Sequence, residues 1–386
     1  MGLKKLIKEK FKVLHQEEPL LFRSPGRVNL IGEHTDYNNG FVLPAAIEKA
    51  IYFAISKRDD SEVNLYAYNL NESDQFNISN PNFIKGKWSN YLKGVVDQLN
   101  KMGCKFNGFN CVFGGDIPIG AGLSSSAALE AGLAFALNHI FNLGLEKLTI
   151  VKLAQKAENE FVGMNCGIMD QYINVFGKSG NVVRIDCQSL DYEYFPFDFK
   201  DLSIVLFNSL VTHSLASSEY NKRREECNLG VAIIQKKYPE VKSLRDVSEE
   251  MLREVKDEIN DVVYKRCKYA VEETDRVIKA CDSLIEKDLK KFGKYMFQTH
   301  EGLSKDYEVS CEEMDYLVEL TKGNEDILGA RMMGGGFGGC TINLIKNSGI
   351  EKSVEYISQK YKSRYGKELE VYITTISNGT ELLSDN

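Results

Sequence analysis

Residues 24–37 read SPGRVNLIGEHTDY and place Arg, Asn, Glu, His and Asp closely around two glycines. Glu33, His34 and Asp36 supply several hydrogen-bond donors and acceptors within four residues, which suits a ligand with many hydroxyl groups. Arg27 carries a permanent, forked positive charge of the kind that binds phosphate or carboxylate. A lone Glu-His pair would more simply indicate a polar turn with an internal salt bridge, but the density of the whole stretch predicts a ligand site.

A second segment, PIGAGLSSSAA at 118–128, follows a strand-like run and opens a helix-like run. Glycines let backbone approach a phosphate, and a helix N-terminus offers unpaired N–H groups and a positive dipole end. The serines add hydroxyls, one of which could reach Mg²⁺. The segment lacks the Gly-Lys-Ser/Thr ending of a Walker loop and the dinucleotide fingerprint. Taken alone, it fits an N-capped helix after a tight turn equally well.

A third segment, RMMGGGFGGC at 331–340, holds five glycines in six residues. Such a run cannot form a stable helix or strand interior, and it lets backbone pack closely against a ligand or another loop. A flexible connector is the alternative. We favour it less, because the run adjoins a predicted strand and contains neither Ser nor Pro.

Around these segments, strands and helices mix without a regular βαβ alternation, which predicts the α+β class. The length of 386 residues predicts two domains, which we place at 1–195 and 196–386 because of a polar break near 191–201. Helices are expected at 127–141 and 150–161, and a single apolar helix face at 278–292. The expected strands lie at 51–55, 63–68, 109–113, 182–185, 203–207, 341–345 and 370–376.

Composition excludes several classes of protein. Hydrophobic residues make up 43% and charged residues 27% of the chain, which is ordinary for a globular protein. The net charge of -7 argues against a nucleic-acid or anionic-membrane partner. The sequence contains no apolar run long enough for a membrane span or a secretory signal, so we expect a cytoplasmic protein. We also expect a monomer or a weak oligomer. Nine unclustered cysteines predict reduced thiols and no zinc cluster.

The three segments, in this order, resemble the three motifs of the GHMP small-molecule kinases, and the first resembles the galactokinase signature within that family. Two further stretches support the resemblance, CGIMDQY at 166–172 and HSLASSEYNKRREEC at 213–227. The similarity covers about residues 22–345. It implies an N-terminal lobe of the ribosomal protein S5 domain 2-like type and a C-terminal ferredoxin-like lobe, with the site between them.

The resemblance also implies an activity and its residues. The activity is transfer of the ATP γ-phosphoryl group to the C1 hydroxyl of α-D-galactose, the first committed step of galactose breakdown (the Leloir pathway), with ATP as co-substrate and Mg²⁺ as cofactor. Asp170 matches the catalytic base, Arg27 its cationic partner, and Ser126 and Glu158 the Mg²⁺ positions. The matched sugar-binding positions are Glu33, His34, Thr35, Asp36, Gly167 and Tyr220. The matched ATP phosphate-loop positions are Gly120, Ala121, Gly122, Leu123, Ser124, Ser125 and Ser126.

The sequence leaves alternative functions open. One alternative is a kinase for N-acetylgalactosamine. Its site would differ from that of a galactose kinase in the space near the second carbon of the sugar, which the sequence shows poorly. A sensor that binds galactose and ATP without turnover is disfavoured, because Ser124–Ala128 is intact. Taken singly, Asp170 could be a structural carboxylate and Glu158 a solvated boundary residue. One departure from the family is Met333, where these kinases usually carry Thr.

Overall fold

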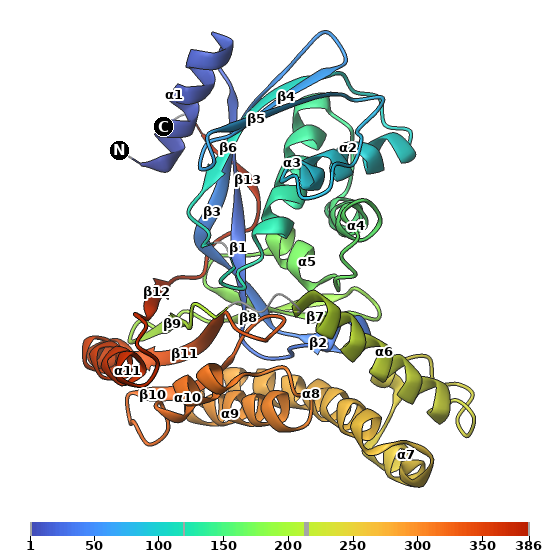
Figure 1. The fold of residues 1–386 in the computed structure, drawn as a ribbon, viewed down its shortest axis with the longest axis vertical. Coiled ribbons are helices and arrows are strands. Elements are labelled where there is room, and N and C mark those ends of the chain that lie inside the picture. The colour runs from blue at the N-terminus through green and yellow to red at the C-terminus, as the bar shows by residue number, and fades with distance from the viewer. Residues whose placement is uncertain (1, 119, 212–215, 385–386) are drawn as a thin grey trace.

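The computed structural model describes residues 2–118, 120–211 and 216–384, and Figure 1 shows their arrangement. Residue 119 of the second segment and residues 213–215 of the supporting stretch lie outside the described residues. The described chain contains helices and mostly antiparallel sheets, which confirms the predicted α+β class. Among these residues, no helix combines the length and apolar character that crossing a bilayer requires.

The first lobe is built on a six-stranded sheet in the order β13-β1-β3-β6-β4-β5. Its strands are β1 (Leu20–Asn29), β3 (Pro44–Lys57), β4 (Glu62–Ala67), β5 (Glu72–Asn77), β6 (Phe109–Gly115) and β13 (Glu381–Leu382). Helix α1 (Leu3–His15) covers one face. The helices that pack in the layer on the other face are α2 (Asn90–Lys101), α3 (Ser125–Phe141), α4 (Lys147–Lys156) and α5 (Met169–Phe176).

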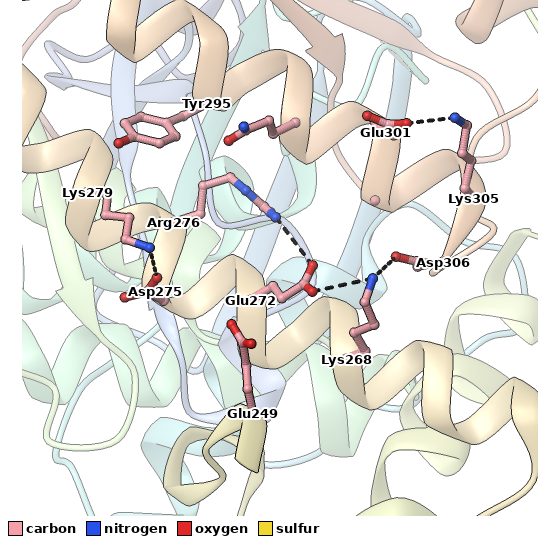
Figure 2. Close-up of a pocket in the computed structure, with 12 residues that line it drawn as sticks. Glu249, Lys268, Glu272, Asp275, Arg276, Lys279, Tyr295, Glu301, Lys305 and Asp306 are labelled. Carbon is pink, nitrogen blue, oxygen red and sulfur yellow. Dashed lines mark hydrogen bonds and ion pairs between the residues drawn. The ribbon is translucent and has the colours of Figure 1, made fainter. Parts of the chain in front are cut away.

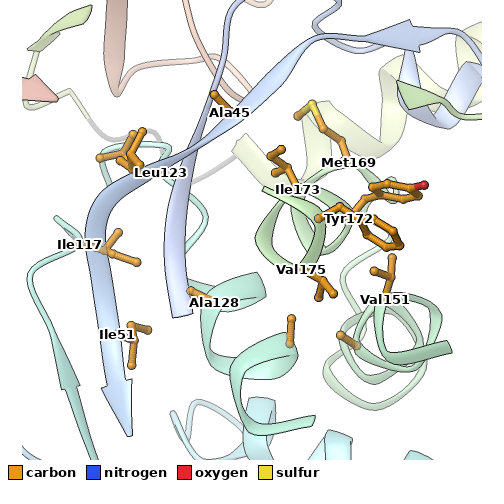
Figure 3. Packing of buried hydrophobic residues seen from close by; sticks show 14 of the residues in the cluster. Ala45, Ile51, Ile117, Leu123, Ala128, Val151, Met169, Tyr172, Ile173 and Val175 are labelled. Atoms are coloured by element: carbon orange, nitrogen blue, oxygen red, sulfur yellow. The ribbon is translucent and has the colours of Figure 1, made fainter. Parts of the chain in front are cut away.

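Successive side chains of β1 and β3 point to opposite faces of the sheet, and both faces are buried. Leu21 and Ala54 pack with α1, whereas their neighbours Phe22 and Phe53 join the core under the other helices. Figure 3 shows part of that core, with side chains from β3, α3, α4 and α5 in one layer. This packing fixes the start of α3, and with it the second segment, against β1.

The second lobe contains a four-stranded antiparallel sheet in the order β10-β11-β9-β12. Its strands are β9 (Leu202–Asn208), β10 (Ile327–Met332), β11 (Cys340–Lys346) and β12 (Glu370–Thr374). The helices of this lobe are α6 (Ala216–Ile234), α7 (Glu249–Glu254), α8 (Asp261–Ile285), α9 (Leu289–Lys305), α10 (Glu312–Glu319) and α11 (Ile350–Tyr365). The third segment forms the loop between β10 and β11, as its glycines predict.

A small sheet lies where the two lobes meet (Figure 1). It pairs β2 (Phe41–Val42) with β7 (Asn181–Asp186), and β7 with β8 (Tyr192–Pro196). Helix α8 packs against β2 and β8. Short helical turns complete the described chain: η1 (Asp36–Asn38), the π-helical η2 (Ala157–Val162), η3 (Leu244–Asp246), η4 (Lys256–Glu258) and η5 (Asn347–Gly349).

Three details differ from the prediction. The apolar face expected over 278–292 belongs to two helices, because Lys287 has a left-handed φ of 58° and the Asp288 side chain caps α9 through the Lys291 N–H. Strand β8 occupies part of the expected polar break at 191–201. The short strand β13 pairs with β1, so this end of the predicted 196–386 domain lies in the first sheet. The boundary near 195 stays a prediction.

Candidate active site

A cavity of about 520 Å³ opens between the two lobes, at the ends of β1, α3 and α5. It brings together residues from all three segments and from both supporting stretches. The predicted site residues that line it are Arg27, Glu33, His34, Asp36, Ser126, Glu158, Gly167, Asp170 and Tyr220. Gly334, Gly335 and Gly336 of the third segment close one part of the wall.

Arg27 and Asp170 form a bidentate ion pair in this cavity. The guanidinium donates from Nε to Asp170 Oδ1 at 2.8 Å and from Nη2 to Oδ2 at 2.9 Å. Arg27 follows an irregularity in the pairing of β1 with β3, which redirects the strand at its inner end. Asp170 lies in the first turn of α5, where the helix dipole favours a negative charge. The Ser124 hydroxyl also donates to Asp170 Oδ2.

The second segment forms a tight loop that ends at the N-terminus of α3. Gly120, Gly122 and Ser124 have φ values of 77°, 72° and 58°, a region that glycine enters more easily than other residues. The Gly122 carbonyl accepts a hydrogen bond from Arg27 Nη1. A Cβ placed on Gly334 would lie 3.6 Å from Gly122, so the second and third segments are in contact. The loop therefore exposes backbone at a helix N-terminus beside a fixed cation.

Ser126 and Glu158 lie together in the cavity wall. Glu158 is 6% exposed and lies in the π-helical turn η2, where Gln171 Nε2 donates to its Oε2 at 2.6 Å. Burial raises the pKa of Glu158, and the Ser126 hydroxyl opposes this shift. A buried carboxylate beside a hydroxyl is a hard oxygen donor set that fits Mg²⁺ completed by phosphate oxygens and water. Sequence reasoning missed Gln171, whose role depends on a residue thirteen positions away.

Asp36 and Gly167 are matched in shape. A Cβ on Gly167 would lie 1.7 Å from Asp36 Oδ2, so only glycine leaves room for this carboxylate. Burial, together with the charge of Asp170, raises the pKa of Asp36 to about 7. Burial lowers the pKa of the neighbouring His34 to about 4, so its imidazole is neutral at physiological pH. The cavity thus contains two hydrogen-bonding groups that lose their protons at different pH, Asp36 near pH 7 and His34 near pH 4.

Aromatic hydroxyls hold the His34 ring in place. His34 Nδ1 lies 2.8 Å from the Tyr37 hydroxyl, which lies 2.8 Å from the Tyr307 hydroxyl. Tyr220 of α6 packs against the same imidazole, with ring centroids 5.5 Å apart. Burial raises the pKa of Tyr37 well above its usual value, so its hydroxyl stays neutral. Sequence reasoning missed Tyr307, a single tyrosine after a helix that no local pattern distinguishes.

The structure does not bring Thr35 to the cavity. Its hydroxyl is buried and donates to the carbonyls of Gly32 at 2.9 Å and Phe41 at 2.6 Å. Thr35 therefore shapes the loop that carries its neighbours. Met333 is also buried and does not line the cavity, and its N–H donates to the Cys340 carbonyl at 3.0 Å.

A second cavity, of about 480 Å³, adjoins the first. Ser126 lines both cavities, so the N-terminus of α3 lies where they meet. Aromatic side chains that sequence reasoning did not single out form much of its wall, namely Tyr68, Trp88, Tyr91 and Phe113. Such a wall suits a flat aromatic ligand.

A charged groove of about 440 Å³ runs between α8 and α9 (Figure 2). Its cations are paired within the groove: Lys268 lies 2.8 Å from Asp306 and 3.4 Å from Glu272. Lys305 pairs with Glu301, also in the groove, at 2.6 Å. Because these charges already neutralise one another, the groove is a poorer candidate for the site than the two adjoining cavities.

Family models match the chain in three places. The galactose-binding signature of galactokinases matches residues 9–57, the N-terminal domain of GHMP kinases matches 90–178, and the C-terminal domain of GHMP kinases matches 277–362. These three ranges contain the first, second and third segments, respectively.

Whole-chain comparisons agree with these matches. The chain is 40% identical to the galactokinase of Clostridium acetobutylicum over all of both chains, and 42% identical to that of Clostridium beijerinckii over 96% of both. The solved galactokinase of Lactococcus lactis complexed with galactose is 35% identical, with a TM-score of 0.95 over 99% of this chain and all of that chain. A solved mevalonate kinase, 23% identical, shares the fold with a TM-score of 0.64 over 93% of this chain and 99% of that chain. The chain therefore belongs to the galactokinases, within the GHMP kinase family.

Proposed function

We propose that this enzyme transfers the γ-phosphoryl group of ATP to the C1 hydroxyl of α-D-galactose, giving galactose 1-phosphate and ADP. The observation that carries the proposal is the junction at Ser126, where an aromatic cavity and a polar cavity meet at a helix N-terminus. This arrangement supports a nucleotide on one side, its phosphates at the junction, and a sugar on the other side.

The polar cavity suits a monosaccharide. Glu33, Asp36 and His34 lie in its wall and can bond sugar hydroxyls in fixed directions. Burial by itself raises the pKa of Glu33, but Arg331 and Arg27 outweigh it and hold that pKa below its usual value. Glu33 is therefore an ionised acceptor at neutral pH. A site that pairs an axial C4 hydroxyl leaves buried polar groups unpaired with the equatorial epimer, so glucose should be a poor substrate.

Asp170 accepts the proton of the C1 hydroxyl as that oxygen attacks the γ-phosphorus. Arg27 orients the carboxylate through two hydrogen bonds and lies where negative charge develops on the transferring group. Phosphoryl transfer depends mainly on positioning and charge stabilisation, and this ion pair supplies both. Ser124 donates to the same carboxylate and fixes its rotamer.

The second cavity takes the adenine ring, and the N–H groups at the start of α3 take the phosphates. Trp88 and Tyr91 offer apolar faces for the base. Ser126 and Glu158 would hold Mg²⁺, which when bound neutralises charge on the phosphate oxygens. Both residues line the sugar cavity as well, so the transferring phosphoryl group would lie within reach of the acceptor hydroxyl.

An ADP-release assay over a panel of sugars tests this proposal. Galactose should be turned over with ATP and Mg²⁺, glucose should be poor, and the product places the enzyme at the entry to galactose breakdown. Faster turnover of N-acetylgalactosamine than of galactose would show a different sugar 1-kinase. Tight binding of galactose and ATP without ADP release would show a sensor.

A further inference from the structure

The first-motif loop, residues 30–36, has a backbone shape that is fixed partly by Thr35 of the loop itself and partly by groups outside the loop. Gly32 and His34 have φ values of 90° and 60°, and a non-glycine residue adopts such a value only at a cost in free energy. A segment of this kind keeps its shape when surrounding groups fix it. The groups outside the loop therefore help to decide where Glu33, His34 and Asp36 lie in the cavity.

Glu273 of α8 is one of these groups. Its side chain is fully buried, and Oε1 accepts a hydrogen bond from the Gly32 N–H at 2.8 Å. Thr299 of α9 donates to the two carboxylate oxygens at 3.0 and 2.9 Å, and Arg276 pairs with Oε2. A fully buried carboxylate needs such partners, and here one of them is the backbone of the first-motif loop.

Arg331 of β10 holds the same loop through other atoms. It is fully buried, its Nε donates to the Leu30 carbonyl at 2.8 Å, and its Nη1 donates to Glu33 Oε2 at 2.8 Å. Its Nη2 donates to the Asn29 carbonyl. The forked guanidinium thus fixes both the backbone where the loop begins and the side chain of Glu33, a residue predicted to bind the sugar.

We propose that Glu273 and Arg331, which belong to the second lobe and do not line the cavity, are the positioning residues that set the sugar site in the first-motif loop. The inference rests on the proposed function, because it takes this loop to be the part that binds galactose. Removing either group should weaken sugar binding more than nucleotide binding, since the aromatic cavity is formed by residues of the first lobe.

Glu272 supplies a matched control. It neighbours Glu273 on α8 and lies 3.7 Å from the same Arg276, but its carboxylate faces the charged groove of Figure 2. Glu272→Ala therefore removes a carboxylate from the same helix and the same arginine without removing a contact to the first-motif loop. Glu273→Gln keeps an oxygen that can accept from Gly32, and Arg331→Lys keeps the charge without the fork.

The test measures galactose and ATP dissociation constants separately by calorimetry, and hydrogen exchange of peptides covering residues 28–38. Glu273→Ala and Arg331→Lys should raise the galactose dissociation constant by about tenfold or more, the size expected for losing a hydrogen bond to a charged group. The ATP constant should stay within about twofold of the wild-type value. Exchange in 28–38 should rise, Glu273→Gln should have a smaller effect, and Glu272→Ala should match wild type.

Equal losses of galactose and ATP affinity, or wild-type galactose affinity in folded Arg331→Lys and Glu273→Ala proteins, would overturn the inference. If Glu273→Ala does not fold, the two conservative variants decide. A wild-type enzyme that does not phosphorylate galactose would overturn the proposed function instead. The exchange measurement needs no sugar, so it still tells whether Glu273 and Arg331 fix the loop.

Discussion

Asp36 is a carboxylic acid whose proton is lost only near neutral pH, because burial and the charge of Asp170 raise its pKa to about 7. Sugar hydroxyls bond best to the ionised form, so galactose binding should weaken as the pH falls through 7. Below that value the galactose dissociation constant should rise by up to about tenfold per pH unit, as one bound proton requires. Calorimetry without nucleotide between pH 5.5 and 8.5 measures this directly.

Asp36→Asn is the control for this pH dependence. The amide does not titrate, so the variant should bind galactose more weakly at pH 8 but with a flat profile. His34, whose pKa is about 4, stays neutral throughout this range. A wild-type dissociation constant that does not change between pH 8 and 5.5 would show that Asp36 does not bond the sugar as an ionised acceptor.

Asp170 should matter for rate more than for binding. Asp170→Asn keeps the shape but removes the proton acceptor, so the single-turnover rate should fall by about 10²–10⁴-fold. The galactose dissociation constant should change little. The double variant with Arg27→Ala should be little slower than the slower single variant, because the two side chains are one bidentate unit. Near-normal turnover in Asp170→Asn would leave Asp170 only an orienting role.

Several residues of the cavity were predictable because they share short segments with other polar residues and glycines. Glu33, His34 and Asp36 belong to one such run, and Asp170 belongs to another. Tyr307 and Trp88 were not predictable, since each stands alone in its own stretch. Tyr307 reaches Tyr37 and His34, and Trp88 reaches the aromatic cavity, only through tertiary packing. Thr35 shares the run, but its hydroxyl bonds the backbone and does not face the cavity.

At the scale of elements, the N-terminus of α3 is the point where the two cavities meet. Ser126→Ala and Glu158→Ala should raise the Mg²⁺ concentration needed for half-maximal rate by about tenfold or more, because each removes an oxygen from the donor set. Galactose binding without nucleotide should change less. Initial rates over a Mg²⁺ titration, with calorimetry for galactose, measure both effects.

Ser125→Ala is the matched control, because Ser125 lines the aromatic cavity but not the polar cavity. It should leave the Mg²⁺ dependence close to wild type. Unchanged Mg²⁺ dependence in both the Ser126 and the Glu158 variants would exclude them as ligands of the metal.

Strands and long helices were largely predictable, β6 and β11 from short apolar runs of strand length and α3 from a long helix-forming run that is apolar almost all round. The break between α8 and α9 was not, because the apolar spacing continues through it while Lys287 and Asp288 end one helix and begin the next. The buried state of Glu158 was also hidden, since it depends on the π-helical turn η2 and on Gln171 of α5.

At the scale of the whole molecule, the site depends on contacts between residues about 300 positions apart. Arg331 bonds Leu30 and Glu33, and Arg23 of β1 donates to the Asn378 carbonyl near the C-terminus. Sequence periodicity carries no information about such pairs, so the return of β13 to the first sheet could not be predicted. The three segments and their order were more informative, because these segments meet at one cavity.

The identity of the product is the most direct test of the proposed activity. The enzyme would be incubated with ATP, Mg²⁺ and galactose, and the sugar phosphate examined by ³¹P and ¹H nuclear magnetic resonance. We expect one product, phosphorylated on the α-anomeric C1 oxygen and formed in step with ADP, and little product when glucose replaces galactose. Phosphate on another hydroxyl, equal use of glucose, or ADP formed without a sugar phosphate would contradict a galactose 1-kinase.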